Sequence, residues 1–281
     1  MIKVEKIQNL VELAILSAYL KGEQPVSLLI TAPVEAGKTE LLLQFASNKG
    51  VLVLTDATAF GIMRDYGQPI INRQIRHLII ADLIKPMSRS KDTVHTLITF
   101  LNGLLEEGIF RMSTYADKTG SPLQGIAINQ QPIPVKCGLI TTMAKEVLLD
   151  GRHHWSRVGF MSRLLPISYD YTVATQAEIH ESISKRAYLE NKPIELDLPN
   201  EDVDIELPQK QAEQLTLLSS FILSSTRKDS PERVYGFRLH KHLQRLAMAN
   251  ALKEKRDKVQ DRDAELLREL SVCLNLDYYP L

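Results

Sequence analysis

The segment from residue 32 to residue 39 has the residue types of a phosphate-binding loop. Its residues are Ala32, Pro33, Val34, Glu35, Ala36, Gly37, Lys38 and Thr39. In such a loop the backbone N–H groups surround phosphate oxygens, the lysine contacts the β- and γ-phosphates, and the threonine hydroxyl binds Mg²⁺. Ala32 stands where the pattern G-x-x-x-x-G-K-[ST] has its first glycine, but Gly37, Lys38 and Thr39 are retained. The segment predicts binding of a nucleoside triphosphate with Mg²⁺.

A carboxylate after a second apolar run could support that metal ion. Asp82 directly follows the apolar residues 78–81, and an aspartate at the end of a buried strand is the usual partner of the loop threonine in the magnesium shell. A guanine-binding Asn-Lys-x-Asp motif would indicate GTP, but the nearest match, residues 191–194, ends in Ile194. The nucleotide is therefore expected to be ATP.

The elements around these residues predict an α/β fold. Short apolar runs of strand length occur at residues 27–31, 51–54, 77–81, 138–142 and 164–169. Helical spacing occurs between them at residues 38–47, 93–107 and 143–149. Runs that are apolar on both faces and separated by helices predict a parallel sheet that is covered on both sides. The phosphate-binding loop would follow the first strand of that sheet.

The second half of the chain predicts only helices. Amphipathic patterns occur at residues 176–190, 210–225, 236–255 and 262–275. We therefore expect a nucleotide-binding α/β core over residues 1–172 and an all-helical lid domain over residues 173–281. Six acidic residues and no basic residue lie between Ile194 and Leu207, and residues 191–208 are expected to be a solvated acidic linker.

Composition excludes several classes of protein. The 281 residues include 34 basic and 34 acidic residues, so overall charge does not direct the chain to nucleic acid or to an anionic membrane. Cys137 and Cys273 lack the spacing of a metal site, and we expect neither a disulfide nor zinc. The N-terminal residues do not resemble a signal peptide, and no run of about 18 apolar residues predicts a membrane span. These features predict a cytoplasmic protein that does not bind membranes.

The order of these parts resembles that of an AAA+ ATPase. Within that superfamily the chain looks most like the motor domain of the minichromosome maintenance helicases, over about residues 26–276. Three stretches carry the closer match: residues 92–111, which resemble the helix that leads into an inserted hairpin; residues 160–165, Phe-Met-Ser-Arg-Leu-Leu, which resemble Leu-Leu-Ser-Arg-Phe-Asp; and residues 236–247 with 259–263, which resemble the lid helix and its sequel.

The resemblance implies roles for particular residues. Lys38 and Thr39 would hold phosphate and Mg²⁺, and Asp82 would support the metal. Thr141 or Thr142 would orient the attacking water. Arg163 would act on a neighbouring subunit's nucleotide as an arginine finger, and Arg238 would reach the phosphates from the lid. Each of these two arginines could instead form an ordinary surface ion pair, and Arg233 and Arg245 are alternatives to Arg238.

Leu83 departs from the family pattern. The family has glutamate directly after the metal-supporting aspartate, where it activates water, and leucine cannot accept a proton. Glu35 and Asp56 are possible substitutes, although Asp56 would lie two strands from the loop. We therefore expect ATP binding with slow hydrolysis, and a gain in hydrolysis for Leu83→Glu if the rest of the site is intact.

Two regions could contact nucleic acid, although each could equally be a solvated loop. Lys85, Arg89 and Lys91 follow the carboxylate strand, and Arg111 and Lys118 flank the hairpin expected between Ile109 and Val135. Residues 152–155, Arg-His-His-Trp, could bind metal or stack on a base, but polar surface is the expected role.

These features lead to two functional hypotheses. The leading one is an oligomeric ATP-binding AAA+ protein, a ring or filament with nucleotide at subunit interfaces, that acts on DNA as a helicase-like motor or helicase loader and could bind a partner protein. The alternative is a scaffold or assembly switch that ATP organises with little turnover.

Overall fold

A five-stranded parallel sheet forms the centre of the molecule. The computed structural model describes residues 3–109, 111–112, 127–128, 134–149, 159–187, 192–224 and 236–276. The strands are β1 (Leu28–Ala32), β2 (Val51–Leu54), β3 (His77–Ile80), β6 (Gly138–Ala144) and β7 (Leu165–Ser168). They lie in the order β2-β3-β6-β1-β7, and all pairings are parallel. The predicted α/β class and parallel sheet are confirmed.

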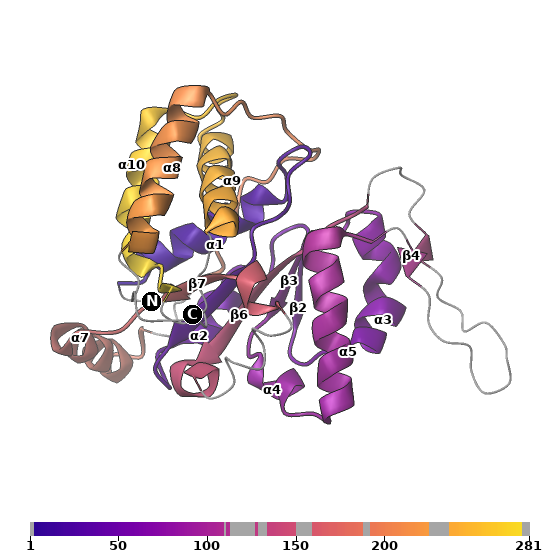
Figure 1. Ribbon diagram of the computed structural model, residues 1–281. Coiled ribbons are helices and arrows are strands. Elements are labelled where there is room, and N and C mark those ends of the chain that lie inside the picture. The colour runs from indigo at the N-terminus through magenta and orange to yellow at the C-terminus, as the bar shows by residue number, and fades with distance from the viewer. Residues whose placement is uncertain are drawn as a thin grey trace, which may run out of the picture.

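Helices cover both sides of the sheet and form a separate group above it (Figure 1). In chain order they are α1 (Glu5–Ser17), α2 (Lys38–Leu43), α3 (Ala59–Ile71), α4 (Ile84–Met87), α5 (Lys91–Asn102) with the π-helical turn η1 (Gly103–Glu107), a helical segment at residues 145–149, the 3₁₀ turn η2 (Met161–Arg163), α7 (Val173–Ser184), α8 (Gln209–Ser224), α9 (Phe237–Lys253), α10 (Asp261–Leu270) and the 3₁₀ turn η4 (Ser271–Cys273). Helices α3 and α5 lie together on one side, and α8, α9 and α10 pack on one another.

The strand register determines which loops meet. Leu28 pairs with Ile140 of β6 and with Leu165 of β7, and Ala32 pairs with Ala144. Because β1 and β6 end side by side, the loops that follow them lie at one edge of the sheet. The residues that precede β7 lie at the opposite edge.

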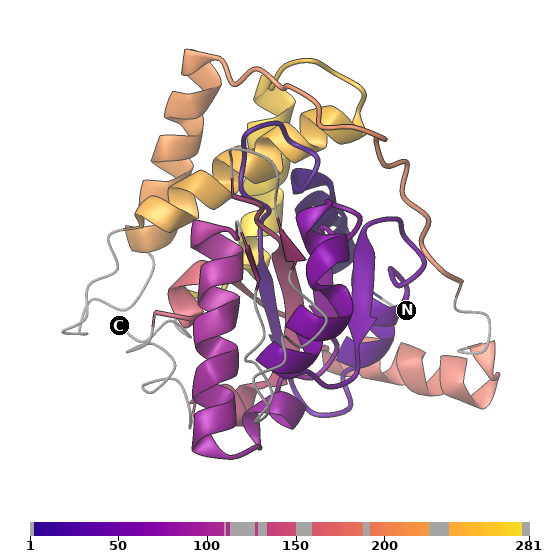
Figure 2. The ribbon, with the colours of Figure 1, turned by 90° about the vertical axis from the view of Figure 1, so that its right-hand side faces the viewer.

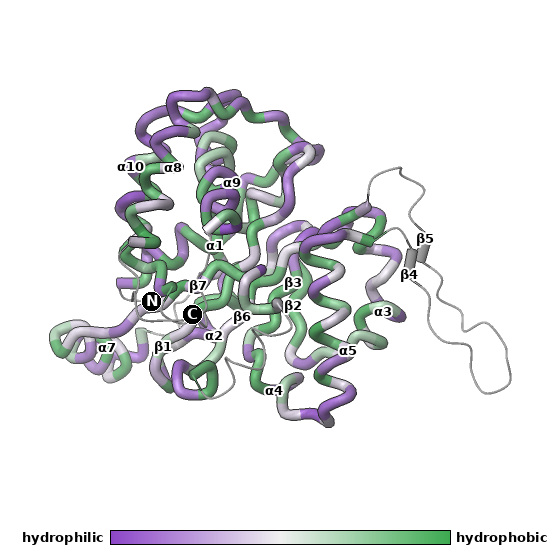
Figure 3. Tube along the Cα trace, viewed as in Figure 1, coloured by the Kyte–Doolittle hydropathy of each residue, from purple (hydrophilic) through white to green (hydrophobic). Residues whose placement is uncertain are grey.

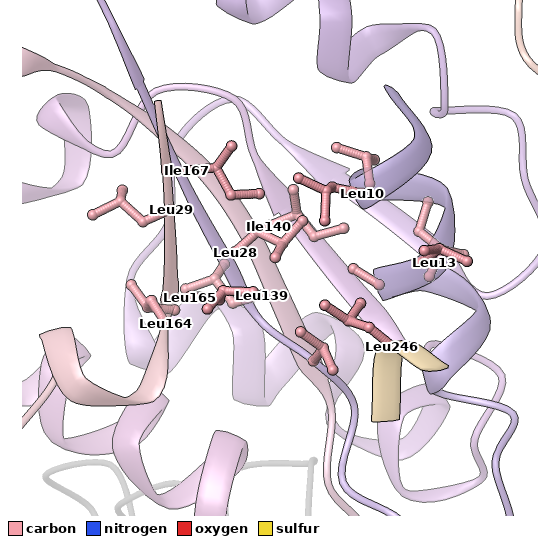
Figure 4. Packing of buried hydrophobic residues seen from close by; sticks show 14 of the residues in the cluster. Leu10, Leu13, Leu28, Leu29, Leu139, Ile140, Leu164, Leu165, Ile167 and Leu246 are labelled. Carbon is pink, nitrogen blue, oxygen red and sulfur yellow. The ribbon is translucent and has the colours of Figure 1, made fainter. Parts of the chain in front are cut away.

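A single apolar cluster joins the sheet to the helices of the second half of the chain. Figure 4 shows Leu10 and Leu13 of α1 and Leu246 of α9 packed among residues of β1, β6 and β7. The strands are mostly hydrophobic along their length (Figure 3), as burial on both faces requires. The sequence analysis made no secondary-structure prediction for residues 5–17, which form α1 and pack against α9 and α10. The N-terminal segment is therefore part of the same core as the C-terminal helices.

Close packing between β3 and β6 depends on a glycine. The His77 side chain is buried, and its Nε2 atom is 3.1 Å from the Val26 carbonyl oxygen. A Cβ atom on Gly138 would lie 2.1 Å from that nitrogen. Burial lowers the pKa of His77 to about 4, so the imidazole is neutral at physiological pH. Only glycine at position 138 leaves room for this ring between the strands.

The acidic segment has mostly exposed acidic side chains, as the sequence analysis expected, and it also makes specific contacts with the rest of the chain. Within residues 192–208, which the structure describes, Ile194 N donates to Gln44 O, and Asn48 binds the Ile194 carbonyl and the Leu196 N–H through its side chain. Asp202 forms ion pairs with Arg73 and Arg76. Figure 2 shows this segment crossing the molecule from α7 to the upper helices. It is an ordered strap between the α/β layer and the helical layer.

The predicted hairpin is present in the part of the chain that the structure describes. Strands β4 (Arg111–Met112) and β5 (Ala127–Ile128) are antiparallel, and an isolated antiparallel bridge joins Ile109 to Val135. Lys118 and residues 152–155 lie outside the described residues. None of the described helices is both long and apolar enough to span a membrane.

A buried carboxylate holds the connection between α9 and α10. Asp263 is fully buried and accepts hydrogen bonds from Asn250 (2.6 Å), from both Arg256 Nη atoms (2.6 and 2.8 Å) and from Gln260 N (2.7 Å). Burial by itself raises the pKa of Asp263, but these hydrogen bonds and the Arg256 charge outweigh it and hold the pKa below the ordinary value of 3.8. The residues that resemble the family's lid sequel thus form a capping box for α10.

We predict that Asp263→Asn lowers the free energy of unfolding by about 3–5 kcal/mol, because it leaves Arg256 largely buried without its partner. A group with a depressed native pKa adds stability that is present above its unfolded pKa and is lost as the pH falls through its native pKa. Wild-type stability should therefore fall more steeply below pH 4 than that of the variant. Urea denaturation at several pH values measures both effects. Asp261→Asn in the same helix, which breaks an exposed pair with Lys210, should cost at most about 1 kcal/mol.

Candidate functional site

The loop after β1 contains two left-handed residues, of the kind found in anion-binding nests. Glu35 and Gly37 both adopt left-handed conformations, with φ of 65° and 75°. Alternation between right-handed and left-handed residues turns successive N–H groups toward the same side, where they bind anions. Left-handed backbone costs about 1–2 kcal/mol for a residue other than glycine, so Glu35 is held against its preference. Val34 and Thr39 are exposed, and Ala36 is buried.

Lys38 lies over this loop. Its Nζ atom donates to the carbonyl oxygens of Ala32 at 3.0 Å and Pro33 at 2.6 Å. Burial lowers the pKa of Lys38, and the negative charges of Glu146, Asp82 and Glu40 oppose that shift, in this order of size. Lys38 therefore lies where carboxylates from three different parts of the chain act on it.

Two tyrosines, which the sequence analysis did not identify, support the loop. The hydroxyls of Tyr169 and Tyr171 both donate to the Ala36 carbonyl oxygen, at 2.8 and 3.0 Å. Their rings pack edge to face with centroids 5.6 Å apart. Burial raises the pKa of both tyrosines, so both hydroxyls keep their protons and remain donors. The sequence feature that could have identified these tyrosines is an aromatic-x-aromatic pair directly after β7, the strand that pairs with β1.

Asp82 lies at the same edge of the sheet, two residues after β3. Its Oδ1 atom accepts the Ile84 N–H at 3.0 Å, which orients the carboxylate at the start of α4. The next residue, Leu83, donates its N–H to the Thr142 carbonyl oxygen at 3.0 Å. The Leu83 side chain is 0% exposed and belongs to the apolar core. Leu83 therefore serves the packing of the core.

The threonines at the end of β6 have partners in β3 and its following loop. Thr141 Oγ1 donates to Ile80 O at 2.7 Å, and Thr142 Oγ1 donates to Ala81 O at 2.6 Å. Both side chains are buried. The one proton of each hydroxyl is thus used to join β6 to the segment that leads to Asp82. The orientation of water by Thr142 stays a prediction. The structure shows in addition that Thr142 contacts Ala81, the residue before Asp82.

Asp56 is remote from the loop. It follows β2, which β3 and β6 separate from β1. Its carboxylate forms an ion pair with Arg89. Hydrogen bonding to Arg89 is the main cause that lowers the pKa of Asp56. This aspartate cannot replace the missing glutamate, and Arg89 is not a free cation on its loop.

Arg163 and Arg238 meet at the opposite edge of the sheet. Arg238 makes a bidentate contact with Glu106, with distances of 2.7 and 2.8 Å, and also donates to Ser162 Oγ. Arg163 Nε lies 2.7 Å from Glu106 Oε2, an ion pair whose N–H is not aligned with the oxygen. Burial raises the pKa of Glu106, but the contact with Arg238 and the charge of Arg163 outweigh it and lower the pKa overall. Glu106, which the sequence analysis missed, therefore holds both arginines as an ionised carboxylate.

The pocket at this cluster is strongly basic. Its lining residues are Gln24, Glu106, Arg163, Arg238, Lys241, His242 and Arg245. His242 is buried, and neither of its ring nitrogens has a hydrogen-bond partner among the described residues. Burial and the charges of Arg245 and Arg238 lower its pKa to about 3, so the imidazole is neutral. A surface with this charge suits an anion.

The strand register places Arg163 and Lys38 far apart along the sheet. Arg163 is level with residue 26, since Leu165 pairs with Leu28. Lys38 lies beyond Ala32, so at 3.3 Å per residue the two positions are roughly 20 Å apart along the sheet. The structure brings Lys38 and Asp82 to one edge, and it brings Arg163 and Arg238 together at the other.

Among the described residues, no group of three or more His, Cys, Asp or Glu side chains could hold a metal ion by itself. Mg²⁺ commonly keeps several waters and binds through one or two protein ligands together with substrate phosphates. Thr39 and Asp82 are a donor set of that kind. No family model matches this chain, and no curated protein matches it.

The burial of Leu83 changes one expectation from the sequence. A glutamate at position 83 would place an unpaired carboxylate in the core and would not reach the loop. We predict that Leu83→Glu lowers the free energy of unfolding by about 3 kcal/mol or more and gives no gain in hydrolysis. Leu83→Met, which conserves volume, should cost less than about 1.5 kcal/mol. Chemical denaturation with a phosphate-release assay tests this, and a stable, faster Leu83→Glu protein would contradict it.

Proposed function

We propose that this protein binds ATP with Mg²⁺ at the loop after β1. The observation that carries the proposal is the position of Lys38 over a loop with left-handed residues at 35 and 37, beside the carboxylate of Asp82. Phosphate oxygens offer Lys38 better acceptors than the two carbonyls it now contacts. Helix α2 has only six residues, so individual loop N–H groups and the lysine charge, more than a helix dipole, would bind the phosphates.

The fold supports the further proposal that the chain is an AAA+ ATPase. Strand β6, which contains Thr141 and Thr142, lies between the strand of the phosphate-binding loop and the strand of Asp82. A group of helices follows the sheet in sequence and packs above it, as the resemblance implies. The inserted hairpin after α5 agrees with the closer likeness to the minichromosome maintenance motor.

Each residue of the site has a distinct part in this proposal. Lys38 and the loop N–H groups would bind the β- and γ-phosphates, and the tyrosine contacts to Ala36 would keep the loop in shape. Thr39 and Asp82 would hold Mg²⁺, which when bound offsets charge on the β- and γ-phosphate oxygens. Arginines near the transferred phosphoryl group would stabilise its charge in the transition state.

We further propose that this nucleotide lies between subunits of a homo-oligomer. Arg163 and Arg238 are roughly 20 Å from the loop of their own chain, so they can reach a nucleotide that belongs to a second copy. The basic pocket at Arg163, Arg238, Lys241 and Arg245 has the charge to receive that copy's phosphates. Glu106 would hold the arginines in the free subunit and give them up to the phosphates on assembly.

Two forms of this function remain. In the first, a ring or filament acts on DNA as a helicase-like motor or loader. The exposed side chains of Lys85 and Lys91 and the β4–β5 hairpin are its candidate contacts. In the second, ATP organises a scaffold with little turnover, which the apolar residue at position 83 favours. Phosphate release measured with and without single-stranded and duplex DNA distinguishes the motor from the scaffold. DNA should stimulate ATP hydrolysis only by a motor that acts on it.

We predict that Lys38→Ala abolishes ATP binding without unfolding the chain. A ligand that binds only the native state at 100 times its Kd stabilises that state by about 2.7 kcal/mol. ATP with Mg²⁺ should therefore raise the wild-type melting temperature and leave that of the variant unchanged. Lys49→Ala removes an exposed lysine that contacts Asn200 and should keep the full shift. Unaltered ATP affinity in Lys38→Ala would remove the basis of the site.

We also predict that ATP promotes self-association and that Arg163→Ala weakens this effect at least tenfold in the association constant. Arg238 keeps its bidentate contact with Glu106 in the variant, so the monomer should stay folded. Arg64→Ala serves as the control because Arg64 is exposed and contacts its neighbour Asp65 and the ring of Phe60 on the same helix. Sedimentation velocity with and without ATP measures the effect. A wild-type protein that stays monomeric with ATP well above micromolar protein concentration would argue against subunit-shared nucleotide.

A further inference from the structure

We propose that Glu146 is the carboxylate that positions and deprotonates the attacking water, in place of the glutamate that the chain lacks at position 83. This inference rests on the proposed ATP site and adds a catalytic residue to it. Glu146 follows β6, the strand between the one that carries the phosphate-binding loop and the one that leads to Asp82. The sequence pattern gave no reason to single it out.

The strand register places Glu146 beside the loop. Ala144, the last residue of β6, pairs with Ala32, the last residue of β1. Neighbouring strands are about 4.8 Å apart, and Glu146 comes only two residues later, in the helical segment at residues 145–149. Its side chain is exposed and therefore open to water. Glu146 thus leaves the sheet next to the point where the loop begins.

Electrostatics agrees with this placement. Glu146 exerts the largest effect of any carboxylate on Lys38, ahead of Asp82 and Glu40. Glu40 also acts on Tyr169 and Tyr171, which follow β7, so Glu40 lies on the β7 side of the loop. Glu146 and Asp82 follow β6 and β3 on the other side. Glu146, proposed for the water, and Asp82, proposed for Mg²⁺, therefore lie on the same side of Lys38.

The other candidate carboxylates are less suitable. Asp56 is paired with Arg89 and is separated from β1 by two strands. Glu35 lies within the loop, in the left-handed conformation that helps to form the nest. For Glu146 the structure gives no ion pair or hydrogen bond with any described residue. Glu146 is therefore available to bind a water molecule.

The proposed hydrolysis step forms one bond, breaks one bond and transfers one proton. The water oxygen forms a bond to the γ-phosphorus while the bond from that phosphorus to the β,γ-bridging oxygen breaks, and the electron pair of the broken bond leaves with ADP. The Glu146 carboxylate accepts the proton that the water loses and later releases it to solvent. Phosphate and ADP are the products. General-base help of this kind typically contributes 10²- to 10⁴-fold in rate.

The test is Glu146→Gln, which keeps the shape of the side chain and removes its basicity. We expect kcat to fall at least 100-fold while the Kd for ATP, measured by a fluorescent analogue and by thermal shift, changes less than threefold. The Mg²⁺ concentration required for binding should also stay the same. Because hydrolysis stops after binding, ATP-dependent assembly should persist longer in the variant. Glu40→Gln removes a second charge near Lys38 and should retain kcat within threefold.

Each other outcome counts against the inference. A Glu146→Gln protein with wild-type kcat shows that another group activates water. A fall in both variants shows that only the charge around Lys38 matters, and a raised Mg²⁺ requirement shows that Glu146 is a metal ligand. A wild-type protein that binds ATP and does not hydrolyse it overturns the inference and leaves the proposed ATP site standing. A wild-type protein that does not bind ATP overturns the proposed function itself.

Discussion

Parallel pairing of β1 with β6 and β7 is the constraint on which the chemistry of this chain depends. Parallel strands all end at one edge, so the loops after β1, β3 and β6 meet there, and with them Lys38, Asp82 and Glu146. The same rule sends residues that precede a strand to the other edge, where Arg163 lies. In the function proposed above, one part of the nucleotide site therefore lies at each edge of the sheet, and a second copy would be needed to complete the site.

The loop is held in a strained shape by contacts from within the phosphate-binding motif and from outside it. Glu35 is left-handed, and such a conformation persists only where the surroundings over-determine it. The two tyrosine hydroxyls on the Ala36 carbonyl and the Lys38 bonds to Ala32 and Pro33 are those surroundings. Since the tyrosines follow β7, which pairs with β1, the pairing of these strands and the conformation of the loop support each other.

Helix α1 and the acidic strap, residues 192–208, join the helical layer to the sheet. Helix α1 packs on α9, and the acidic strap connects Asn48, near the end of α2, to the segment before α8. Asp202 on the strap forms ion pairs with both Arg73 and Arg76, and Arg76 lies over the Tyr19 ring at 4.2 Å from its centroid. Among the acidic residues of the strap, Asp202 makes the part-buried ion pairs, and the other five are exposed.

The sequence by itself determined the parallel α/β core, the five strands nearly to the residue, the loop and the four C-terminal helices, because each of these leaves a periodic or a local signal. It did not predict α3, whose Gly61, Gly67 and Pro69 weaken the helical pattern, or α1. Only the tertiary structure decided that Leu83 is buried, that Asp56 is paired with Arg89, that Glu106 holds Arg163 and Arg238, and that Glu146 and two tyrosines border the loop. These relations join residues distant in sequence through strand order and register, which no local pattern encodes.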